Sequence, residues 1–147
     1  DLRMTHIRRS ALVLHSAEAM YDLVEDVESY PEFVPWCESA RLISKGEGEL
    51  VAELEIARGG VRQRFSTRNT FSRPAWMKMV LERGPFSTFS GEWRFTPLGD
   101  SGCRVEMVVD FNLESQLLKH TVGKLFAASA DRMVEAFCQR ADKVNRY

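Results

Sequence analysis

A change of hydrophobic period partway along the chain is the strongest constraint on its fold. Between residues 39 and 113, apolar and polar residues alternate with a period of two, which is typical of strands with one buried face. From 118 to 144, apolar residues recur every three or four positions without an intervening proline, which predicts one long amphipathic helix. Short turns such as Gly84-Pro85 make the strands antiparallel. The pattern predicts an α+β protein whose sheet and helix cover each other's apolar sides.

The residues before the sheet predict one strand and two short helical pieces. The strand covers 7–14, and Ser16 is a suitable N-cap for a helix that follows it. Two prolines in 30–37 prevent a long helix there. The simplest arrangement is a curved sheet wrapped around the C-terminal helix, which at 1.5 Å per residue is about 45–50 Å long. Gly123 is a weak point in that helix.

Composition narrows the class of protein further. The 147 residues are enough for one domain, expected to span 1–147, with its own core. The 20 Lys+Arg and 21 Asp+Glu give a net charge of −1, so we expect no DNA partner. Three well-separated cysteines indicate reduced thiols and a cytoplasmic location. The N-terminus has no apolar signal-peptide core, and Met4 is a candidate native start preceded by residues 1–3.

Polar residues occur on the predicted inner face of one strand. Gln63, Thr67 and Asn69 share a face with Phe65, so they belong either to a buried polar network or to the wall of a pocket. Large and adaptable side chains lie on the neighbouring inner faces: Met77, Met79, Phe89, Trp93, Met107, Phe111 and Met133. Core packing explains each one singly. For the whole group inside a wrapped sheet, a lipophilic pocket and plain core packing explain the pattern equally well.

Basic residues are concentrated in one stretch. No acidic residue lies between 56 and 81, which would suit RNA phosphates or anionic lipid headgroups. With a turn at Arg58-Gly59, Glu55 would face Arg62 across the hairpin, and a shift by one residue would place it beside Arg64. We therefore interpret the stretch as a largely neutralised, solvated strand face. Its basic residues are Arg58, Arg62, Arg64, Arg68, Arg73 and Lys78.

The sequence gives little support for catalysis. His6, His15 and His120 are scattered and lack metal-ligand spacing, and no nucleophile elbow, P-loop or dinucleotide fingerprint occurs. Cys37 has no neighbouring histidine to activate it and is expected to be a packing residue. We therefore predict a protein that is not an enzyme and has no metal or covalent cofactor.

Segment 30–37, here called the proline-aromatic loop, is the best candidate for a functional loop. Phe33 and Trp36 are large apolar groups on a segment that two prolines keep out of regular structure. Such a loop could be a buried plug at one end of the fold, a gate over a pocket, or a tip that touches a membrane. The sequence alone leaves these alternatives open.

Three sequence motifs stand out along the chain. They are Tyr30-Pro31-x-Phe33-Val34-Pro35-Trp36-Cys37, then Gly84-Pro85-Phe86 with Trp93-x-Phe95, and finally Ala136-Phe137-x-x-Arg140-Ala141. Together they resemble the coenzyme Q-binding protein family of the START-type, polyketide cyclase-like helix-grip superfamily. The resemblance implies a helix-grip fold with a curved sheet of about seven strands and a hydrophobic cavity suited to ubiquinone. It also implies a bacterial form, because mitochondrial members carry a transit peptide. Bacterial relatives are also described as ribosome-association toxins that bind the large ribosomal subunit.

The resemblance leads to a specific hypothesis. The chain would hold ubiquinone or a polyprenylated precursor as a bound ligand, act as a lipid chaperone in respiration and ubiquinone biosynthesis, and touch the inner membrane transiently. Gln63, Thr67 and Asn69 would orient the quinone head. Phe33, Pro35 and Trp36 would form the gate. The tail would lie along Phe65, Met77, Met79, Phe89, Trp93, Met107, Phe111, Val122, Phe126, Met133 and Phe137. The alternatives are a ribosome-binding toxin and a cyclase-type enzyme.

Overall fold

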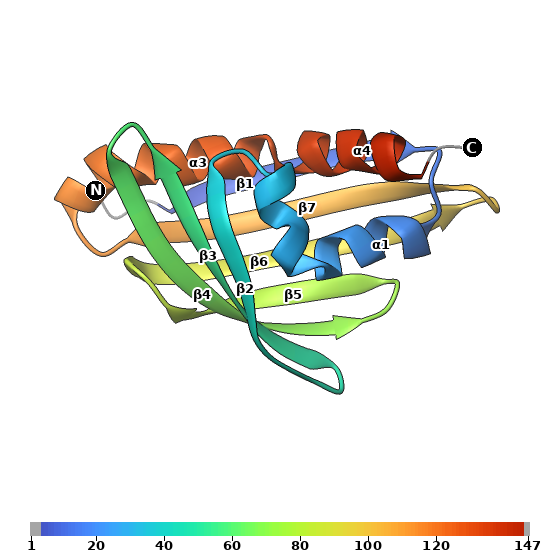
Figure 1. Ribbon diagram of the computed structural model, residues 1–147, viewed down its shortest axis with the longest axis horizontal. Coiled ribbons are helices and arrows are strands. Elements are labelled where there is room, and N and C mark those ends of the chain that lie inside the picture. The colour runs from blue at the N-terminus through green and yellow to red at the C-terminus, as the bar shows by residue number, and fades with distance from the viewer. Residues whose placement is uncertain (1–3, 146–147) are drawn as a thin grey trace.

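The computed structural model describes residues 4–145, and residues 1–3, which precede the candidate start, lie outside that range (Figure 1). The N-terminal part contains β1 (Thr5–Val13), α1 (Ala17–Glu25) and the 3₁₀ helix η1 (Val27–Glu32). Six strands follow: β2 (Cys37–Gly46), β3 (Glu49–Arg58), β4 (Val61–Ser72), β5 (Trp76–Arg83), β6 (Phe86–Leu98) and β7 (Gly102–Leu113). The C-terminal part contains α2 (Gln116–Leu118), the π-helical turn η2 (Lys119–Gly123), α3 (Lys124–Asp131) and α4 (Met133–Val144).

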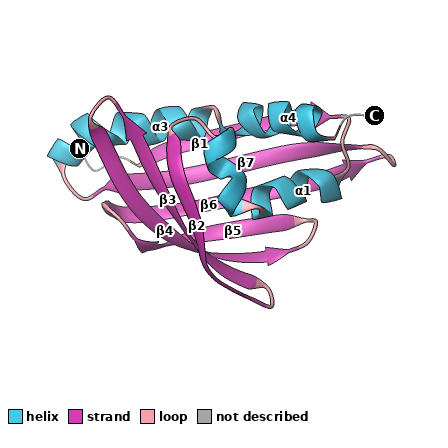
Figure 2. Ribbon diagram, in the orientation of Figure 1, coloured by secondary structure: helices cyan, strands magenta, loops and turns pink. Residues whose placement is uncertain are grey.

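The strands form one strongly curved antiparallel sheet. Its order is β1-β7-β6-β5-β4-β3-β2, so the first strand lies beside the last and β2 is at the other edge. The C-terminal helices run along the sheet, and α1 with η1 covers the remaining part of the same side (Figures 1 and 2). This confirms the predicted helix-grip architecture with two short helices after the first strand.

Local chemistry explains where these elements begin and turn. The Ser16 hydroxyl accepts a hydrogen bond from the Ala19 amide at 3.1 Å, so it caps α1 as predicted. The β3–β4 turn uses Gly59 and Gly60, with φ of 54° and 87°, rather than the Arg58-Gly59 pair. Two consecutive positive φ angles suit glycine, which has no Cβ to clash. The register is therefore shifted by one residue, and Glu55 lies opposite Arg64.

The β5–β6 hairpin is paired along only part of its length. The ladder runs from Trp76 opposite Arg94 to Val80 opposite Ser90, and the described pairing of these strands ends there. The turn begins at Gly84, where a Cβ would lie 2.7 Å from the Cβ of Phe65. The two strands therefore separate toward their turn while β6 remains paired with β7 as far as Phe86.

The C-terminal helix is not continuous, and the expectation of one uninterrupted helix is wrong. After the α-helical first turn α2, the chain is π-helical over η2, which ends at Gly123, the predicted weak point. A second break lies at Arg132, whose φ of −98° and ψ of 0° separate α3 from α4. No proline or glycine marks this break, and the apolar stripe continues across it. Phe126 and Phe137 are buried, while Met133, at the break, is half-buried.

Two aromatic clusters fill the space between the sheet and the helices. Phe137 is fully buried, and its ring contacts those of Tyr30, Phe33 and Trp93 at centroid distances of 5.3, 4.9 and 5.1 Å. The second cluster lies nearer α3 and comprises Phe65, Phe86, Phe89, Phe111 and Phe126. The contacts of the first cluster are edge-to-face, and those of the second combine edge-to-face, tilted and stacked pairs, geometries that aromatic rings favour in cores.

Candidate functional site

An internal cavity of about 80 Å³ lies between the sheet and the C-terminal helices. Strands β3 to β7 form one wall, and α3 with the first residue of α4 forms the other. Nine of the residues predicted from the sequence line it: Phe65, Thr67, Met79, Phe89, Trp93, Met107, Phe111, Phe126 and Met133.

The other wall residues were not singled out from the sequence. They are Tyr30, Leu54, Ile56, Val109, Ser129 and Ala130. Leu54 and Ile56 occur on the predicted inner face of their strand, and Ala130 belongs to the apolar stripe of the helix. The hydrophobic pattern therefore predicted that these residues face inward, but it could not distinguish residues that line the cavity from other core residues.

Eight predicted site residues lie outside the cavity wall. Asn69, Met77, Val122 and Phe137 are buried elsewhere in the core. Gln63 is half-buried near the start of β4. Phe33, Pro35 and Trp36 are half-buried in the proline-aromatic loop.

The cavity wall is apolar and uncharged. Within residues 4–145, its polar side chains are Tyr30, Thr67 and Ser129. The Tyr30 hydroxyl donates to the carbonyl oxygen of Val24, and the Ser129 hydroxyl donates to that of Pro35 at 3.0 Å. Burial raises the pKa of Tyr30, so its hydroxyl stays neutral. The wall therefore offers apolar surface with a few neutral polar groups, and Thr67 stands in the same row as Asn69.

Asn69 is a buried polar residue that the surrounding core only partly satisfies. It is 4% exposed, and its amide nitrogen donates to the Met77 sulfur at 3.6 Å. Its side-chain oxygen has no hydrogen-bond partner among the described residues. A thioether is a weak acceptor, so this amide is available for a better partner.

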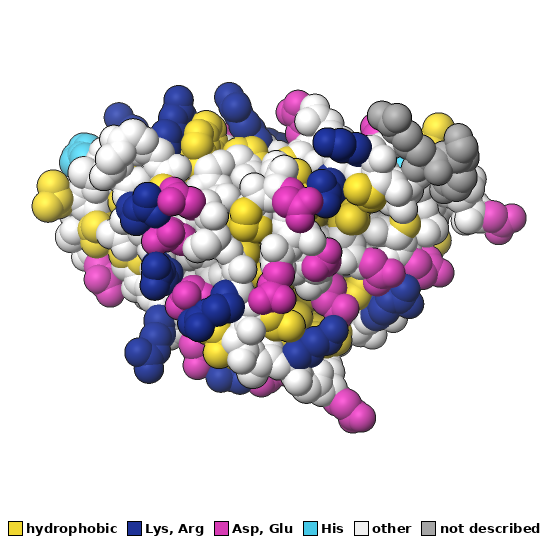
Figure 3. Space-filling model, in the orientation of Figure 1, with side chains coloured by type: hydrophobic (Ala, Val, Ile, Leu, Met, Phe, Trp, Pro, Cys, Tyr) yellow, Lys and Arg dark blue, Asp and Glu magenta, His cyan; other side chains and the backbone are white. Residues whose placement is uncertain are grey.

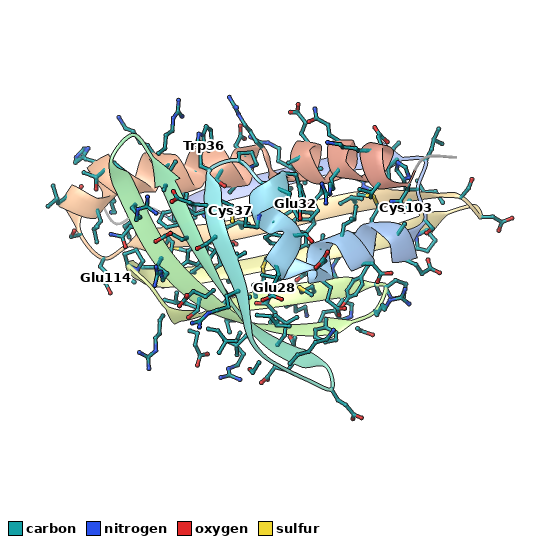
Figure 4. The ribbon with its side chains drawn as sticks, viewed as in Figure 1. Glu28, Glu32, Trp36, Cys37, Cys103 and Glu114 are labelled. Atoms are coloured by element: carbon teal, nitrogen blue, oxygen red, sulfur yellow. The ribbon has the colours of Figure 1, made fainter. Side chains whose placement is uncertain are left out.

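The proline-aromatic loop joins β3 to the break in the C-terminal helix. Trp36 has a φ of 61°, which is unusual for a bulky residue, and its carbonyl oxygen accepts a hydrogen bond from Ala57 at 2.9 Å. Its ring makes cation–π contacts with the guanidinium groups of Arg58 and Arg132, at 4.6 and 5.2 Å from the ring centroid. Figure 4 shows Trp36 and Cys37 at the start of β2. The loop is thus held on both sides.

The arginines of β4 are paired with carboxylates. Arg62 bonds Glu55 and Glu38, each at 2.9 Å, and Arg64 bonds Glu55 at 3.2 Å. Burial alone would raise the pKa of Glu55, but hydrogen bonds and charge from these two arginines lower it. Arg68 contacts Glu49 and Glu82. The interpretation as a largely neutralised strand face is confirmed.

The remaining cations of that stretch are also engaged. Arg73 makes two hydrogen bonds to the carboxylate of Asp22, at 2.8 and 2.9 Å. Lys78 lies over the ring of Trp76 at 5.0 Å. Carboxylates therefore compensate Arg62, Arg64, Arg68 and Arg73, whereas Arg58 and Lys78 contact aromatic rings instead.

The cysteines have the character of packing residues. Cys37 and Cys103 are buried, and burial raises the pKa of each thiol to about 11. A thiol with so high a pKa is a poor nucleophile at neutral pH. In the part of the chain that the structure describes, no group of three or more His, Cys, Asp or Glu residues is placed to hold a metal ion.

A curved antiparallel sheet closed by a C-terminal helix over an apolar cavity defines the START-like class of helix-grip proteins. Among solved structures, a START superfamily protein from Mycobacterium smegmatis matches 95% of this chain and 98% of its own, with a TM-score of 0.78 at 18% identity. The 18 kDa protein CC1736 from Caulobacter crescentus matches 97% and 99%, with a TM-score of 0.75 at 28% identity.

The chain belongs to the polyketide cyclase/dehydrase and lipid transport family, whose model matches residues 13–138. A ribosome association toxin RatA of Pseudomonas aeruginosa is 44% identical over 95% of this chain and 97% of its own. The mitochondrial coenzyme Q-binding protein COQ10 homolog B of Xenopus laevis is 33% identical over 88% of this chain and 54% of its own. These relatives are named as toxin and binding proteins, whereas the solved structures that share the fold include an aromatase/cyclase at 24% identity.

A helix that spans a membrane needs about 20 consecutive, mainly apolar residues. None of the helices in residues 4–145 is both long and apolar enough to cross a bilayer.

Proposed function

We propose that the protein binds a polyprenyl quinone of the ubiquinone type between the sheet and the C-terminal helices. It would serve as a lipid chaperone in respiration and ubiquinone biosynthesis, working in the cytoplasm. The observation that carries this proposal is the uncharged, aromatic and methionine-rich cavity wall. The relationship to a protein named for coenzyme Q binding adds to it.

The chemistry of the wall suits such a ligand. A polyprenyl tail gains about 0.8 kcal/mol per buried CH₂ group, and apolar walls place no directional demand on it. A quinone head has carbonyl oxygens that accept hydrogen bonds. Thr67, on the wall, and Asn69, two residues further along the same inner face, are the donors closest in the chain to that role. Gln63 would act at the outer end of this row.

The cavity must enlarge to hold the ligand. Its volume of about 80 Å³ is well below the roughly 300–1,000 Å³ of typical small-molecule sites. Three methionines of the wall, Met79, Met107 and Met133, have flexible side chains that can repack around an entering group. Phe89 lies just beyond the end of the β5–β6 ladder, where the two strands are no longer paired with each other.

We infer that the protein does not catalyse a reaction on this ligand. A cyclase-type enzyme needs an acid or base that faces the bound molecule. The described wall residues include no charged side chain, and the Tyr30 hydroxyl is committed to a backbone carbonyl. The family model covers cyclases as well as lipid-transport proteins, and the solved aromatase/cyclases that share the fold are 24% identical or less, so neither assigns a reaction to this chain.

Lipid extraction and native mass spectrometry of the protein purified from its own host test the proposal. Ala130, on the wall and 8% exposed, is the position to block. We expect the wild type to carry a quinone and Ala130→Leu, which fills the cavity, to lose most of it. Ala127→Leu is the matched control, because Ala127 lines a surface hollow instead. A wild type without quinone, or equal retention by both variants at equal melting temperature, would refute the proposal.

Ribosome association is the second candidate, favoured by the name of the 44% identical relative. The paired arginines of β4 are the first surface to test. We expect Arg62→Ala with Arg64→Ala to leave both quinone retention and ribosome profiles unchanged, because Glu55 already compensates these charges. Sucrose-gradient profiles and quinone content measure the two outcomes. A clear loss of ribosome association would favour the toxin function over the carrier function.

A further inference from the structure

We propose that one end of the molecule is a docking surface for an anionic lipid bilayer. This surface, called the basic end, consists of Trp36 and Arg58 together with Leu117, Lys119, Lys124 and Arg132 from the C-terminal helices. The inference goes beyond the proposed quinone site, because it depends on exposed charge and apolar surface and not on what the cavity holds.

The basic end carries uncompensated positive charge. No acidic residue occurs from Ser115 to Ala130, a segment that contains Lys119 and Lys124. In the described part of the chain, no carboxylate oxygen lies within 4.0 Å of the cationic groups of Lys119, Lys124, Arg58 or Arg132, in contrast to Arg62, Arg64 and Arg68.

Acidic residues flank this segment on both sides. Asp131 is paired with Arg9, so its charge is already compensated. Glu114 is exposed before α2 and lies away from α3 in Figure 4. The positive charge of the basic end therefore remains available to a partner.

The charges form one continuous surface. Lys124 lines two neighbouring hollows, one shared with Arg58 and the other with Lys119. The ring of Trp36 then joins Arg58 to Arg132. Figure 3 shows Lys and Arg side chains along the edge of the molecule over α3. The end of β3, the π-helical turn η2, the start of α3 and the break after α3 thus contribute their cations to this surface.

Two apolar side chains belong to the same segments as these cations: Leu117 lies two residues before Lys119, and Trp36 contacts Arg58 and Arg132. The Leu117 side chain belongs to a residue that is 73% exposed, the second most exposed large hydrophobic of the described chain. Trp36 is half-buried between its two arginines. This combination binds favourably to a bilayer interface, because leucine inserts at the boundary of the acyl chains while tryptophan and basic residues lie at the level of the headgroups. Binding to nucleic acid would be strengthened by the positive charges, but an exposed leucine would add nothing to its affinity.

Vesicle co-sedimentation of the full chain tests the proposal. We expect the wild type to bind vesicles that contain phosphatidylglycerol and not vesicles of phosphatidylcholine alone, with binding that weakens as salt rises. Lys119→Gln with Lys124→Gln should reduce the partition coefficient roughly 30-fold, at about fivefold per charge. Arg62→Gln with Arg64→Gln removes the same charge from paired positions and should change it less than about threefold.

Leu117→Ser separates a bilayer from a polyanion. It should weaken vesicle binding several-fold and leave binding to heparin or ribosomal RNA unchanged, because only the bilayer takes up the leucine. Melting temperatures show that each variant is folded. Absence of vesicle binding by the wild type, equal losses in the two double variants, or a lysine effect seen with RNA but not with vesicles would each overturn the proposal. Quinone content is measured separately, so a failure of the proposed quinone function would not change the result of the vesicle experiment.

Discussion

Phe137→Ala is expected to lower the free energy of unfolding by about 3–5 kcal/mol, the cost typical of truncating a buried aromatic side chain. Phe137 is fully buried in α4, and its ring contacts Tyr30, Phe33 and Trp93 within 5.3 Å between centroids. Removing it would leave a hole where the C-terminal helix, η1 and β6 meet. The walls of this hole belong to both helix and sheet. Neither element can move to fill it without losing other packing contacts, so the cavity persists.

Chemical denaturation followed by tryptophan fluorescence measures this loss. Phe137→Leu keeps most of the volume and should cost markedly less. Val144→Ala is the matched control on the same helix, because Val144 is 47% exposed and its truncation should cost little. A Phe137→Ala protein as stable as Val144→Ala would contradict the helix-grip packing.

Trp36→Ala is expected to weaken quinone capture more than it lowers the melting temperature. The Trp36 ring is half-buried and makes two cation–π contacts, each worth about 0.5–1 kcal/mol at exposed sites. Its loss should therefore cost about 1–2 kcal/mol of stability, whereas truncation of a fully buried plug typically costs about 3–5 kcal/mol. The loop would then be held to β3 and α3 only by the hydrogen bonds that its backbone carbonyl oxygens accept from Ala57 and Ser129, so a long-tailed ligand would escape more readily.

The comparison requires both quantities on the same protein. Quinone retention per folded molecule and melting temperature are measured for Trp36→Ala and for Trp36→Gly. Glycine adopts the φ of 61° without strain, so Trp36→Gly should be the more stable of the two while capturing quinone equally poorly. A severe fall in melting temperature with normal retention would show that the loop is a plug.

The regular elements were predictable because local chemistry specifies them. The period-two pattern identified the strands, and Ser16 identified the start of α1. The sequence left the β3–β4 register open by one residue, and the two positive φ angles at Gly59 and Gly60 decide it. Glu55 faces Arg64 as a result and bonds both Arg62 and Arg64, so the interpretation of the basic stretch holds in either register.

The helix break and the size of the cavity were not predictable in the same way. Arg132 is a good helix former, and the residues on both sides keep one apolar stripe, so nothing local indicates an interruption. The break reflects tertiary contacts, including the stacking of Arg132 on Trp36 and the hydrogen bond from Ser129 to Pro35. Whether inner-face residues meet or leave a space likewise depends on how far the helix stands from the sheet, which alternation does not encode.

The break at Arg132 gives the two halves of the C-terminal helix different roles. α3 lines the cavity, and α4 places Phe137 in the core. A continuous helix would behave as a rigid rod, and any displacement at its start would be transmitted to its end. With the joint at Arg132, a shift of Phe126 or Ala130 need not move Phe137, which stays anchored in the core. We therefore expect α3, which carries most of the helical side of the cavity wall, to shift with less effect on α4 than a continuous helix would allow. The cavity volume can then increase on the α3 side while Phe137 of α4 keeps its contacts in the core.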